Sequence, residues 1–551
     1  MIGVSRFSRT DYIFLLYLLT LVVVYSVYFL SFTLFDGFAT FANDASGYVL
    51  LARKWSPFFE PSIAEIQTWP VQRLPPGFSW VLAVTGASES LWSSHLLVSV
   101  CMLASILLFG WMAYRHLGWL IGGLLTFGLC LLPGTVTSSM GILSENLYLF
   151  MSLVVLLLYS FIKKNENPSW GQYLLLLFFL SMAILTRTVG IALVAAVFVV
   201  PVIDRTLSRR KKIIFSMTAL SSIVLWQVWG ALDPQSHEFS YGNILTSNIS
   251  NSALASAATL DYFWQNIQYN IVQLLSSWNH YLSLRHPNVW FFLFSYGLIV
   301  LCLIGLSLRI YQRKLDAVYL LFYLAILVIW GFTWQMTRFL HPVFLLLILQ
   351  PVLYFANLAR TRYPVPIKTS IIAVILILIV NSIIIQYQLL ELRNAARKDF
   401  PSIAHSFDYY DIHSRDRGKQ TASFYAYLMK YMTASSEHIP IDSIVASVKH
   451  ESFAILADRK AVELVTIVTR IQQLCNLKIK NVDVVFLSGL SNSFNTSGLS
   501  MVEQYKSISS EVWSMGGEGI QVFSYLLMLD RAKLDSELLA EGFACKSYQY
   551  Q

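Results

Sequence analysis

Four charged residues stand out because each lies in or beside a strongly apolar segment, where a charge is costly and usually functional. Asp44 and Glu145 are carboxylates without a basic residue at helical spacing. Arg187 and Arg338 lie at the outer ends of two apolar segments, and a guanidinium group binds phosphate through two parallel hydrogen bonds. Together these residue types favour a site for a phosphate-bearing ligand near a membrane surface.

Each of these residues also has an ordinary structural explanation. Asp44 begins the segment DASGYVLLA, in which Tyr48 and Ala52 follow at helical spacing, so it could simply cap a short interfacial helix. Glu145 opens an apolar helix, where the helix dipole would favour a carboxylate by about 0.3–1 kcal/mol. An arginine can also extend its charge to lipid headgroups. The residue types alone leave these alternatives open.

Three further basic residues are less specific candidates for binding phosphate. Arg285 and His286 are adjacent in SLRHPNVW, and Arg73 precedes the Pro-Pro step of VQRLPPGFSWVL. His341 lies in the apolar run FLHPV, where a histidine packed into the core is the more common case.

The elements that must position these residues are membrane helices, as the distribution of charge shows. Only 13% of all residues are charged, against about 25% in soluble proteins. Residues 1–389 hold 22 Lys and Arg with 13 Asp and Glu, whereas residues 390–551 hold 17 and 18. We therefore predict a membrane module over 1–389 and a soluble domain over 390–551. This distribution excludes a single soluble domain, a fibre and a disordered chain, and because the positive excess lies in the membrane part, it also argues against nucleic-acid binding.

An apolar run of about 20 residues can cross a bilayer as a helix, and the sequence contains about eleven such runs. They lie near 12–33, 91–113, 117–134, 142–162, 170–186, 188–203, 213–232, 289–308, 316–334, 339–356 and 367–389.

The basic residues of the membrane module predict its orientation. Of its 22 Lys and Arg, 16 fall in alternate loops that include the N-terminus, which the positive-inside rule assigns to the cytoplasm. With an odd number of spans the C-terminal domain is outside. Two long outer loops are then expected at 34–90 and 233–288. The first has amphipathic pieces and a Pro-Pro step, as a re-entrant or interfacial segment would.

The C-terminal domain has an α/β pattern after a polar, helical stretch around 402–434. Cys475 and Cys545 both lie in this domain and could pair if it faces an oxidising compartment. We find no phosphate-binding glycine loop and no metal-type Cys/His spacing in the sequence. The predicted strands are 444–448, 453–456, 462–465, 482–487 and 520–528.

Several short motifs occur in an order and on a membrane side that belong together. They are Asp44 with Tyr48 and LAR (51–53), PPGFSWVL (75–82), SENLYLF (144–150), TRTVGI (186–191), RFLHPV (338–343) and IPIDSIVASVKHESFAILADRKAVELV (439–465). In these features the chain resembles the polytopic GT-C-type glycosyltransferases. Within them it is most similar to the bacterial group related to protein mannosyltransferases and the aminoarabinose transferase of lipid A.

The resemblance implies a fold, a reaction and a location. The fold is a GT-C-like helical membrane protein with a C-terminal extracytoplasmic α/β domain, in a bacterial inner (plasma) membrane. The reaction is transfer of a sugar from a polyprenyl-phosphate donor to a hydroxyl of a lipid, glycan or protein acceptor, as an inverting displacement with an aspartate as the base.

The resemblance also implies roles for individual residues. Asp44 carries over as the catalytic base, Tyr48 as a substrate-binding residue, and Arg187 and Arg338 as ligands of the donor phosphate. Many relatives have an acidic pair at the first position, whereas here Asn43 precedes the aspartate. Glu145 is then the expected second carboxylate, and a divalent metal ion is a possible but not a required cofactor.

Two other functions remain open at this point. A flippase for lipid-linked sugars would also need intramembrane charges, but it would favour inverted repeats or Gly/Pro-broken helices, which we do not find in the sequence. An O-antigen-ligase-like enzyme with a lipid diphosphate donor would use a long outer loop rich in Arg and His, and His280, Arg285 and His286 are consistent with this. The C-terminal domain could bind the acceptor or cover the site.

Overall fold

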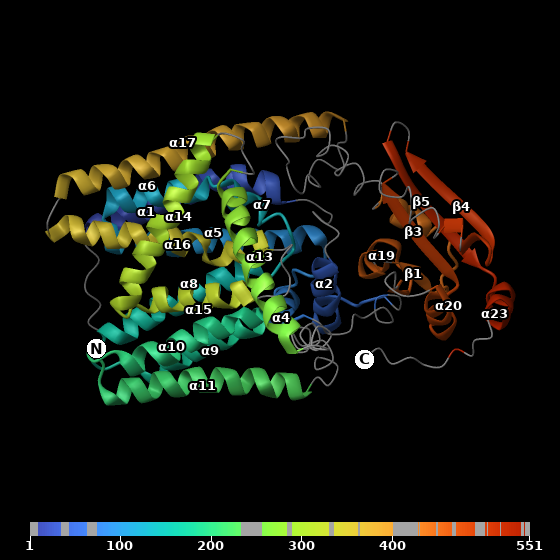
Figure 1. Ribbon diagram of the computed structural model, residues 1–551, viewed down its shortest axis with the longest axis horizontal. Coiled ribbons are helices and arrows are strands. Elements are labelled where there is room, and N and C mark those ends of the chain that lie inside the picture. The colour runs from blue at the N-terminus through green and yellow to red at the C-terminus, as the bar shows by residue number, and fades with distance from the viewer. Residues whose placement is uncertain are drawn as a thin grey trace.

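The chain is described by a computed structural model (Figure 1). It describes residues 9–34, 43–62, 65, 74–232, 256–283, 289–329, 336–361, 364–399, 428, 430–447, 450–464, 470–490, 502–503, 505–517, 520–540 and 545.

Every apolar run predicted to span the membrane falls on a helix. Seven of these helices are long and apolar enough to cross a bilayer, and four are shorter, so a total of eleven spans stays a prediction. The long helices are α1 (Arg9–Thr33), α5 (Leu91–Leu117), α8 (Glu145–Lys164), α11 (Arg209–Leu232), α14 (Val289–Tyr311), α16 (Met336–Thr361) and α17 (Pro364–Asp399). The shorter ones are α6 (Trp119–Cys130), α9 (Trp170–Thr186), α10 (Ile191–Ile203), which follows the 3-10 turn η1 (Thr188–Gly190), and α15 (Leu315–Ile329).

Helices also form within the two predicted outer loops. The short helix α2 (Asn43–Trp55) begins where one was expected, and α4 (Pro76–Val84) follows the Pro-Pro step. The 28-residue α13 (Ser256–Ser283) was not anticipated, because Asn, Gln and Ser interrupt its apolar residues. Outside these loops, the short helix α7 (Pro133–Thr137) lies between α6 and α8.

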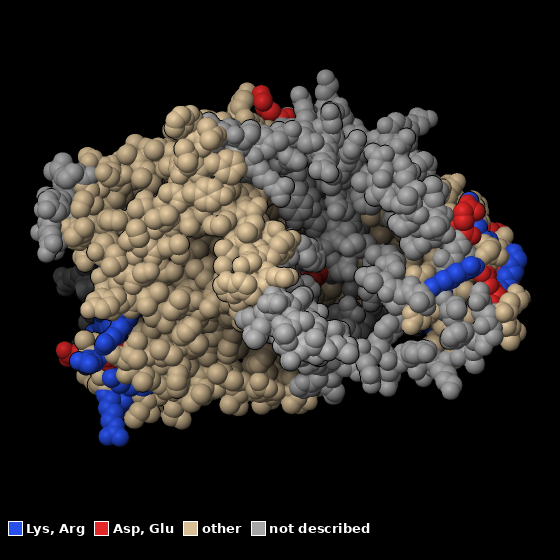
Figure 2. Space-filling view, viewed as in Figure 1, with Lys and Arg blue, Asp and Glu red and all other residues tan. Residues whose placement is uncertain are grey.

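Three of the predicted basic loops meet at one end of the helical bundle. Lys163 Nζ binds Asp204 Oδ2 at 2.5 Å, and Lys211 Nζ donates to the Lys163 carbonyl at 3.2 Å. Arg313 donates to the carbonyl of Ile203 at 2.9 Å. In Figure 2 basic side chains gather at this end, and the helical surface beyond them is almost free of charge, as a membrane-facing surface would be. The C-terminal domain lies at the opposite end (Figure 1).

The C-terminal region is the α/β domain that the sequence predicts. Its five-stranded sheet has the order β2-β1-β3-β5-β4, in which β1 pairs in parallel with β2 and β3, and β5 is antiparallel to β3 and β4. The strands are β1 (Val445–Ser447), β2 (Ala461–Glu463), β3 (Val484–Leu490), β4 (Ser509–Gly517) and β5 (Ile520–Leu529). The helices are α19 (His450–Ala457), α20 (Arg470–Ile479) and α23 (Arg531–Ala540).

The sheet has apolar cores on both of its faces. Successive residues of β3 alternate between them: Val484 and Phe486 belong to the cluster that includes α19, whereas Val485 and Leu487 belong to the cluster of α20 and α23. This alternation follows from the two-residue period of a strand. It explains why the run VDVVFL is apolar almost throughout.

Two sequence predictions for this domain need comment. The predicted strand 453–456 is wrong, because these residues form the middle of α19. A four-residue apolar run has no diagnostic period, and here Phe453, Ala454 and Ala457 are buried at helical spacing. Of the predicted helix around 402–434, the structure describes only 428 and 430–434, which are helical. Because α17 continues past residue 389, the boundary between the two parts also stays a prediction.

The C-terminal domain contacts the membrane module through α19. This helix packs against α2, and its Ile455 lies against the apolar core of the helical bundle. Phe453 on the same helix faces the sheet instead. Helix α19 therefore lies between the two parts of the chain, next to the helix that carries Asp44 (Figure 1).

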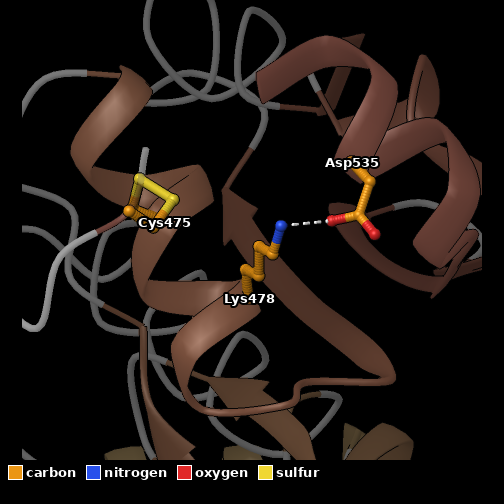
Figure 3. Close-up of a disulfide and its surroundings, with 4 residues drawn as sticks. Cys475, Lys478 and Asp535 are labelled. Atoms are coloured by element: carbon orange, nitrogen blue, oxygen red, sulfur yellow. Dashed lines mark ion pairs between the residues drawn. A yellow bond between two sulfur atoms is a disulfide. The ribbon is translucent and has the colours of Figure 1, made fainter. Parts of the chain in front are cut away.

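A disulfide joins Cys475 of α20 to Cys545 near the C-terminus, closing a sequence separation of 70 residues (Figure 3). We expect Cys545→Ser to lower the free energy of unfolding of the C-terminal domain by about 2–4 kcal/mol, because the unfolded chain regains the entropy of the open loop. The measurement is denaturant unfolding of the purified full-length protein.

The neighbouring ion pair supplies a matched control. Lys478 of α20 binds Asp535 of α23 at 2.7 Å beside the disulfide, and both side chains are about half exposed. Lys478→Ala should therefore cost at most about 1 kcal/mol. Equal stability of the wild type and the Cys545 variant would contradict the predicted role of the disulfide.

Candidate active site

The candidate site lies where several helices begin or end, away from the basic loops. Glu145 is the first residue of α8, and Arg338 lies in the first turn of α16. Arg187 has an extended backbone (φ −149°, ψ 131°) between the end of α9 and η1. Helix α4 approaches this junction closely: a Cβ on Gly77 would lie 2.8 Å from the backbone of Thr186. Because each of these residues lies at the end of its helix, the three charged side chains lie at the same depth in the bundle.

Glu145 is the buried centre of this cluster. Its Oε1 atom lies 2.5 Å from Nη1 of Arg187 and also accepts a hydrogen bond from Nε of Arg338. The inference that this carboxylate is unpaired is therefore wrong. Its partners are 42 and 193 residues away in the chain, so no local spacing could reveal them. Its second oxygen, Oε2, is buried and makes no hydrogen bond within the described part of the chain.

Asp44 is bound by the other side of the same arginine. Nη1 of Arg338 donates to Oδ2 of Asp44 at 2.6 Å, so Arg338 bridges the two carboxylates. The Asp44 side chain is 34% exposed, whereas that of Glu145 is 2% exposed. A molecule that enters the site can therefore reach the aspartate but not the glutamate.

Tyr48 lies one helical turn after Asp44 and joins the same cluster. Its hydroxyl donates to Ser144 Oγ at 3.2 Å, and the same Ser144 oxygen accepts from Nη1 of Arg187 at 3.3 Å. Burial raises the pKa of Tyr48 well above its ordinary value, so the phenol stays protonated and can donate but not act as a base. Ser79 of α4 donates to the Tyr48 carbonyl at 3.0 Å and fixes this turn of α2.

A pocket opens over this cluster. Polar residues that line it include Asp44, Tyr48, Ser144, Arg187, Tyr323 and Arg338. Leu74, Pro75, Leu327 and other residues complete its wall, so the pocket combines an accessible carboxylate, two guanidinium groups and apolar surface.

Sequence reasoning missed Tyr323 of α15. Its hydroxyl donates to the carbonyl of Phe339 at 2.7 Å, and the Phe339 ring lies 5.2 Å from the Arg187 guanidinium carbon. Tyr323 thus fixes the backbone of Phe339, and the ring of Phe339 in turn packs against the guanidinium group of Arg187. The sequence signal that could have revealed it is the pair of tyrosines, Tyr319 and Tyr323, four residues apart in an apolar helix.

The structure places only two of the remaining sequence candidates, His280 and His341. Arg73, Arg285 and His286 lie outside the described residues, so their predicted contacts with phosphate stay predictions. His280 belongs to α13 and does not line the pocket, and His341 is buried in the core as expected. Within the described ranges no group of three or more His, Cys, Asp or Glu residues could hold a metal ion. A metal requirement stays a prediction.

Comparison with known proteins relates the chain to solved membrane enzymes by structure. No protein-family model and no curated protein sequence matches the chain. The crystal structure of ArnT from Cupriavidus metallidurans bound to undecaprenyl phosphate superposes with a TM-score of 0.52 at 14% identity, over 94% of this chain and 98% of ArnT. The oligosaccharyltransferase AglB from Archaeoglobus fulgidus, in complex with an inhibitory peptide and a dolichol-phosphate, is also similar. It has a TM-score of 0.45 at 10% identity, over 92% of this chain and 74% of AglB.

The likeness to ArnT extends over almost the whole of both chains, so it includes the helical module and the C-terminal domain together. The expected fold, a helical membrane module with a C-terminal α/β domain, is therefore confirmed, and it is the fold of ArnT.

Proposed function

We propose that the chain is a membrane glycosyltransferase that moves a sugar from a polyprenyl-phosphate donor to an acceptor hydroxyl at the extracytoplasmic face. One observation carries this proposal: a single pocket joins an accessible carboxylate, Asp44, to the buried Arg187 and the partly buried Arg338. The fold agrees with it, because the ArnT structure of the same fold holds undecaprenyl phosphate.

In this proposal the two arginines bind the donor phosphate. Both line the pocket, and both are held by Glu145, which is too buried to reach a substrate. Glu145 is thus assigned to positioning the arginines rather than to the chemistry. Fixed guanidinium groups stabilise the negative charge that develops on a departing phosphate, because they need not reorient during the reaction. The polyprenyl chain remains in the bilayer beside the pocket.

Asp44 acts as the base. The acceptor oxygen attacks the anomeric carbon of the sugar, and its proton passes to the Asp44 carboxylate. The bond from the anomeric carbon to the phosphate oxygen breaks, and its electron pair leaves with polyprenyl phosphate. One displacement inverts the configuration of the sugar. Asp44 is suited to this step because its side chain is the more exposed of the two carboxylates.

Donor binding also prepares the base. Arg338 Nη1 donates to Asp44 Oδ2 at 2.6 Å. A donor phosphate competes for this guanidinium and weakens its hold on Asp44, while the contact to Glu145 keeps the arginine in place. A carboxylate released from the arginine is free to accept a hydrogen bond from the acceptor hydroxyl, so donor binding makes the aspartate available for proton transfer.

Two observations support the assignment of the site to the extracytoplasmic side. The site lies at the end of the bundle remote from the cluster of Lys163, Lys211 and Arg313, which the positive-inside rule assigns to the cytoplasm. The C-terminal domain holds a disulfide, and disulfides persist in oxidising compartments. A bacterial inner (plasma) membrane with the N-terminus in the cytoplasm agrees with both.

The proposed function first predicts an effect on turnover. In membranes that contain the full chain and a panel of labelled polyprenyl-phosphate sugars, we expect wild type to transfer one sugar and Asp44→Asn to lose about 10²–10⁴-fold in rate. Asp316→Asn is the matched control, because Asp316 is bound by Arg309 at 2.6 Å in a helix-end pair outside the pocket. The control should retain turnover.

The same assay separates the competing functions. Undiminished transfer by Asp44→Asn would contradict the role of the base, and label that changes leaflet without transfer would indicate a flippase. Consumption of a lipid diphosphate donor alone would indicate the ligase-like alternative. Parallel reactions with a chelator and with added Mg²⁺ or Mn²⁺ test the metal requirement.

A second prediction concerns binding of undecaprenyl phosphate to the purified protein. We expect Asp44→Asn to bind it at least as tightly as wild type, because the substitution removes a competitor for Arg338. Arg338→Gln should weaken binding by roughly 10- to 100-fold, as expected for the loss of a charge-assisted hydrogen bond. Loss of binding in Asp44→Asn would show that the aspartate holds the site together instead of serving as the base.

A further inference from the structure

A buried polar network lies directly behind the site. His341 of α16 is fully buried and does not line the pocket. Its Nδ1 atom lies 2.8 Å from the hydroxyl of Tyr281 on α13, and its Nε2 atom lies 2.6 Å from Oδ1 of Asn146 on α8. Both ring nitrogens of this buried histidine make hydrogen bonds, so it does more than fill space in the apolar core.

The network continues the ion pair at the site. His341 follows Arg338 by three residues on α16, and Asn146 follows Glu145 on α8. Residues three apart lie on the same helical face, so the two helices are joined by adjacent pairs, Arg338 with Glu145 and His341 with Asn146. A shift of α16 that breaks the second pair must also move the first.

The directions of the hydrogen bonds follow from the surroundings of Asn146. Its Nδ2 donates to the carbonyl of Val98 at 3.3 Å and to Ser139 Oγ at 2.9 Å. A carbonyl can only accept, so Oδ1 must face the histidine, and Nε2 of His341 must carry the proton. Nδ1 then accepts from the hydroxyl of Tyr281. The network therefore selects the neutral Nε2–H tautomer, and a second proton would add a cation beside Arg338.

Tyr281 is itself fixed on both faces. A Cβ on Gly134 of α7 would lie 2.4 Å from its ring, so only glycine allows this approach. The ring also stacks on Phe344 of α16 with centroids 4.0 Å apart. Since a fully buried tyrosine cannot move without disturbing these contacts, it gives the histidine a fixed donor.

We propose that His341 is a positioning residue: with Asn146 and Tyr281 it holds the first turn of α16 so that Arg338 stays between Glu145 and Asp44. Its effect on catalysis rests on the proposed function, whereas its effect on phosphate binding requires no sugar transfer. The residue acts through Arg338 and does not touch the substrate.

The test compares His341→Leu with a control one turn earlier on α16. Thr337 donates to Ser277 Oγ of α13 at 3.0 Å, so Thr337→Val also removes a hydrogen bond between these two helices, but outside the network. Each full-length variant is reconstituted in lipid nanodiscs. The affinity for undecaprenyl phosphate, the thermal unfolding temperature, and the donor KM and kcat are then measured.

We expect His341→Leu to weaken binding of undecaprenyl phosphate about 10- to 100-fold and to raise the donor KM, because a displaced arginine no longer meets the phosphate. Thr337→Val should lower the unfolding temperature yet bind within about two-fold of wild type. Tyr281→Phe should change binding in the same direction as His341→Leu, and the double variant should lose less than the two losses combined. If binding falls in proportion to stability in every variant, His341 is merely structural.

A spectroscopic readout tests the network without any ligand. In protein with ¹⁵N-labelled histidine rings, the signal that disappears in His341→Leu should be that of a neutral Nε2–H imidazole at neutral pH. A Nδ1–H tautomer or an imidazolium would overturn the proposal. A wild-type chain that binds undecaprenyl phosphate but transfers no sugar would end the proposed function and leave the binding comparison valid.

Discussion

The site depends on one interaction, the hold of two carboxylates on the single guanidinium group of Arg338. Glu145 binds its Nε and Asp44 binds its Nη1. A largely enclosed arginine at the end of a membrane helix is strongly unfavourable without partners, and the buried carboxylate of Glu145 has the same need. Because the partners come from α2, α8 and α16, the ion pairs form only when these three helices are correctly packed. The network thus couples the assembly of the bundle to the assembly of the site.

The two sides of Arg338 differ in a way that chemistry can use. On one side Glu145 is buried and is held in turn by Arg187, so this contact is permanent. On the other side Asp44 is partly exposed at the pocket, where an incoming anion can replace it. A single cation can therefore remain anchored while it exchanges one partner for a phosphate. Two equally buried carboxylates would hold the arginine too firmly to allow such an exchange.

The sequence predicts the parts of this arrangement better than their contacts. Apolar runs locate the spans, since a bilayer imposes their length, and the scarcity of charge in and beside these runs singles out Asp44, Glu145, Arg187 and Arg338. The pairings could not be foreseen, because helix packing alone determines which of several distant charges meet. The pairing of His341 with Asn146 is hidden for the same reason. The strand predicted at 453–456 failed because four apolar residues fit either a helix or a strand.

The position of Asp44 depends finally on contacts outside the bundle. A 13-residue helix such as α2 is marginal in isolation, so its place must come from packing. Ser79 holds its Tyr48 turn, and at the other end Arg53 binds Glu65 and donates to the carbonyl of Ser88 at 2.9 Å. Helix α19 of the C-terminal domain packs on the same helix. A domain that contacts α2 is therefore in a position to set how close Asp44 lies to Arg338, and this gives the C-terminal domain a physical connection to the base whether or not it also binds the acceptor.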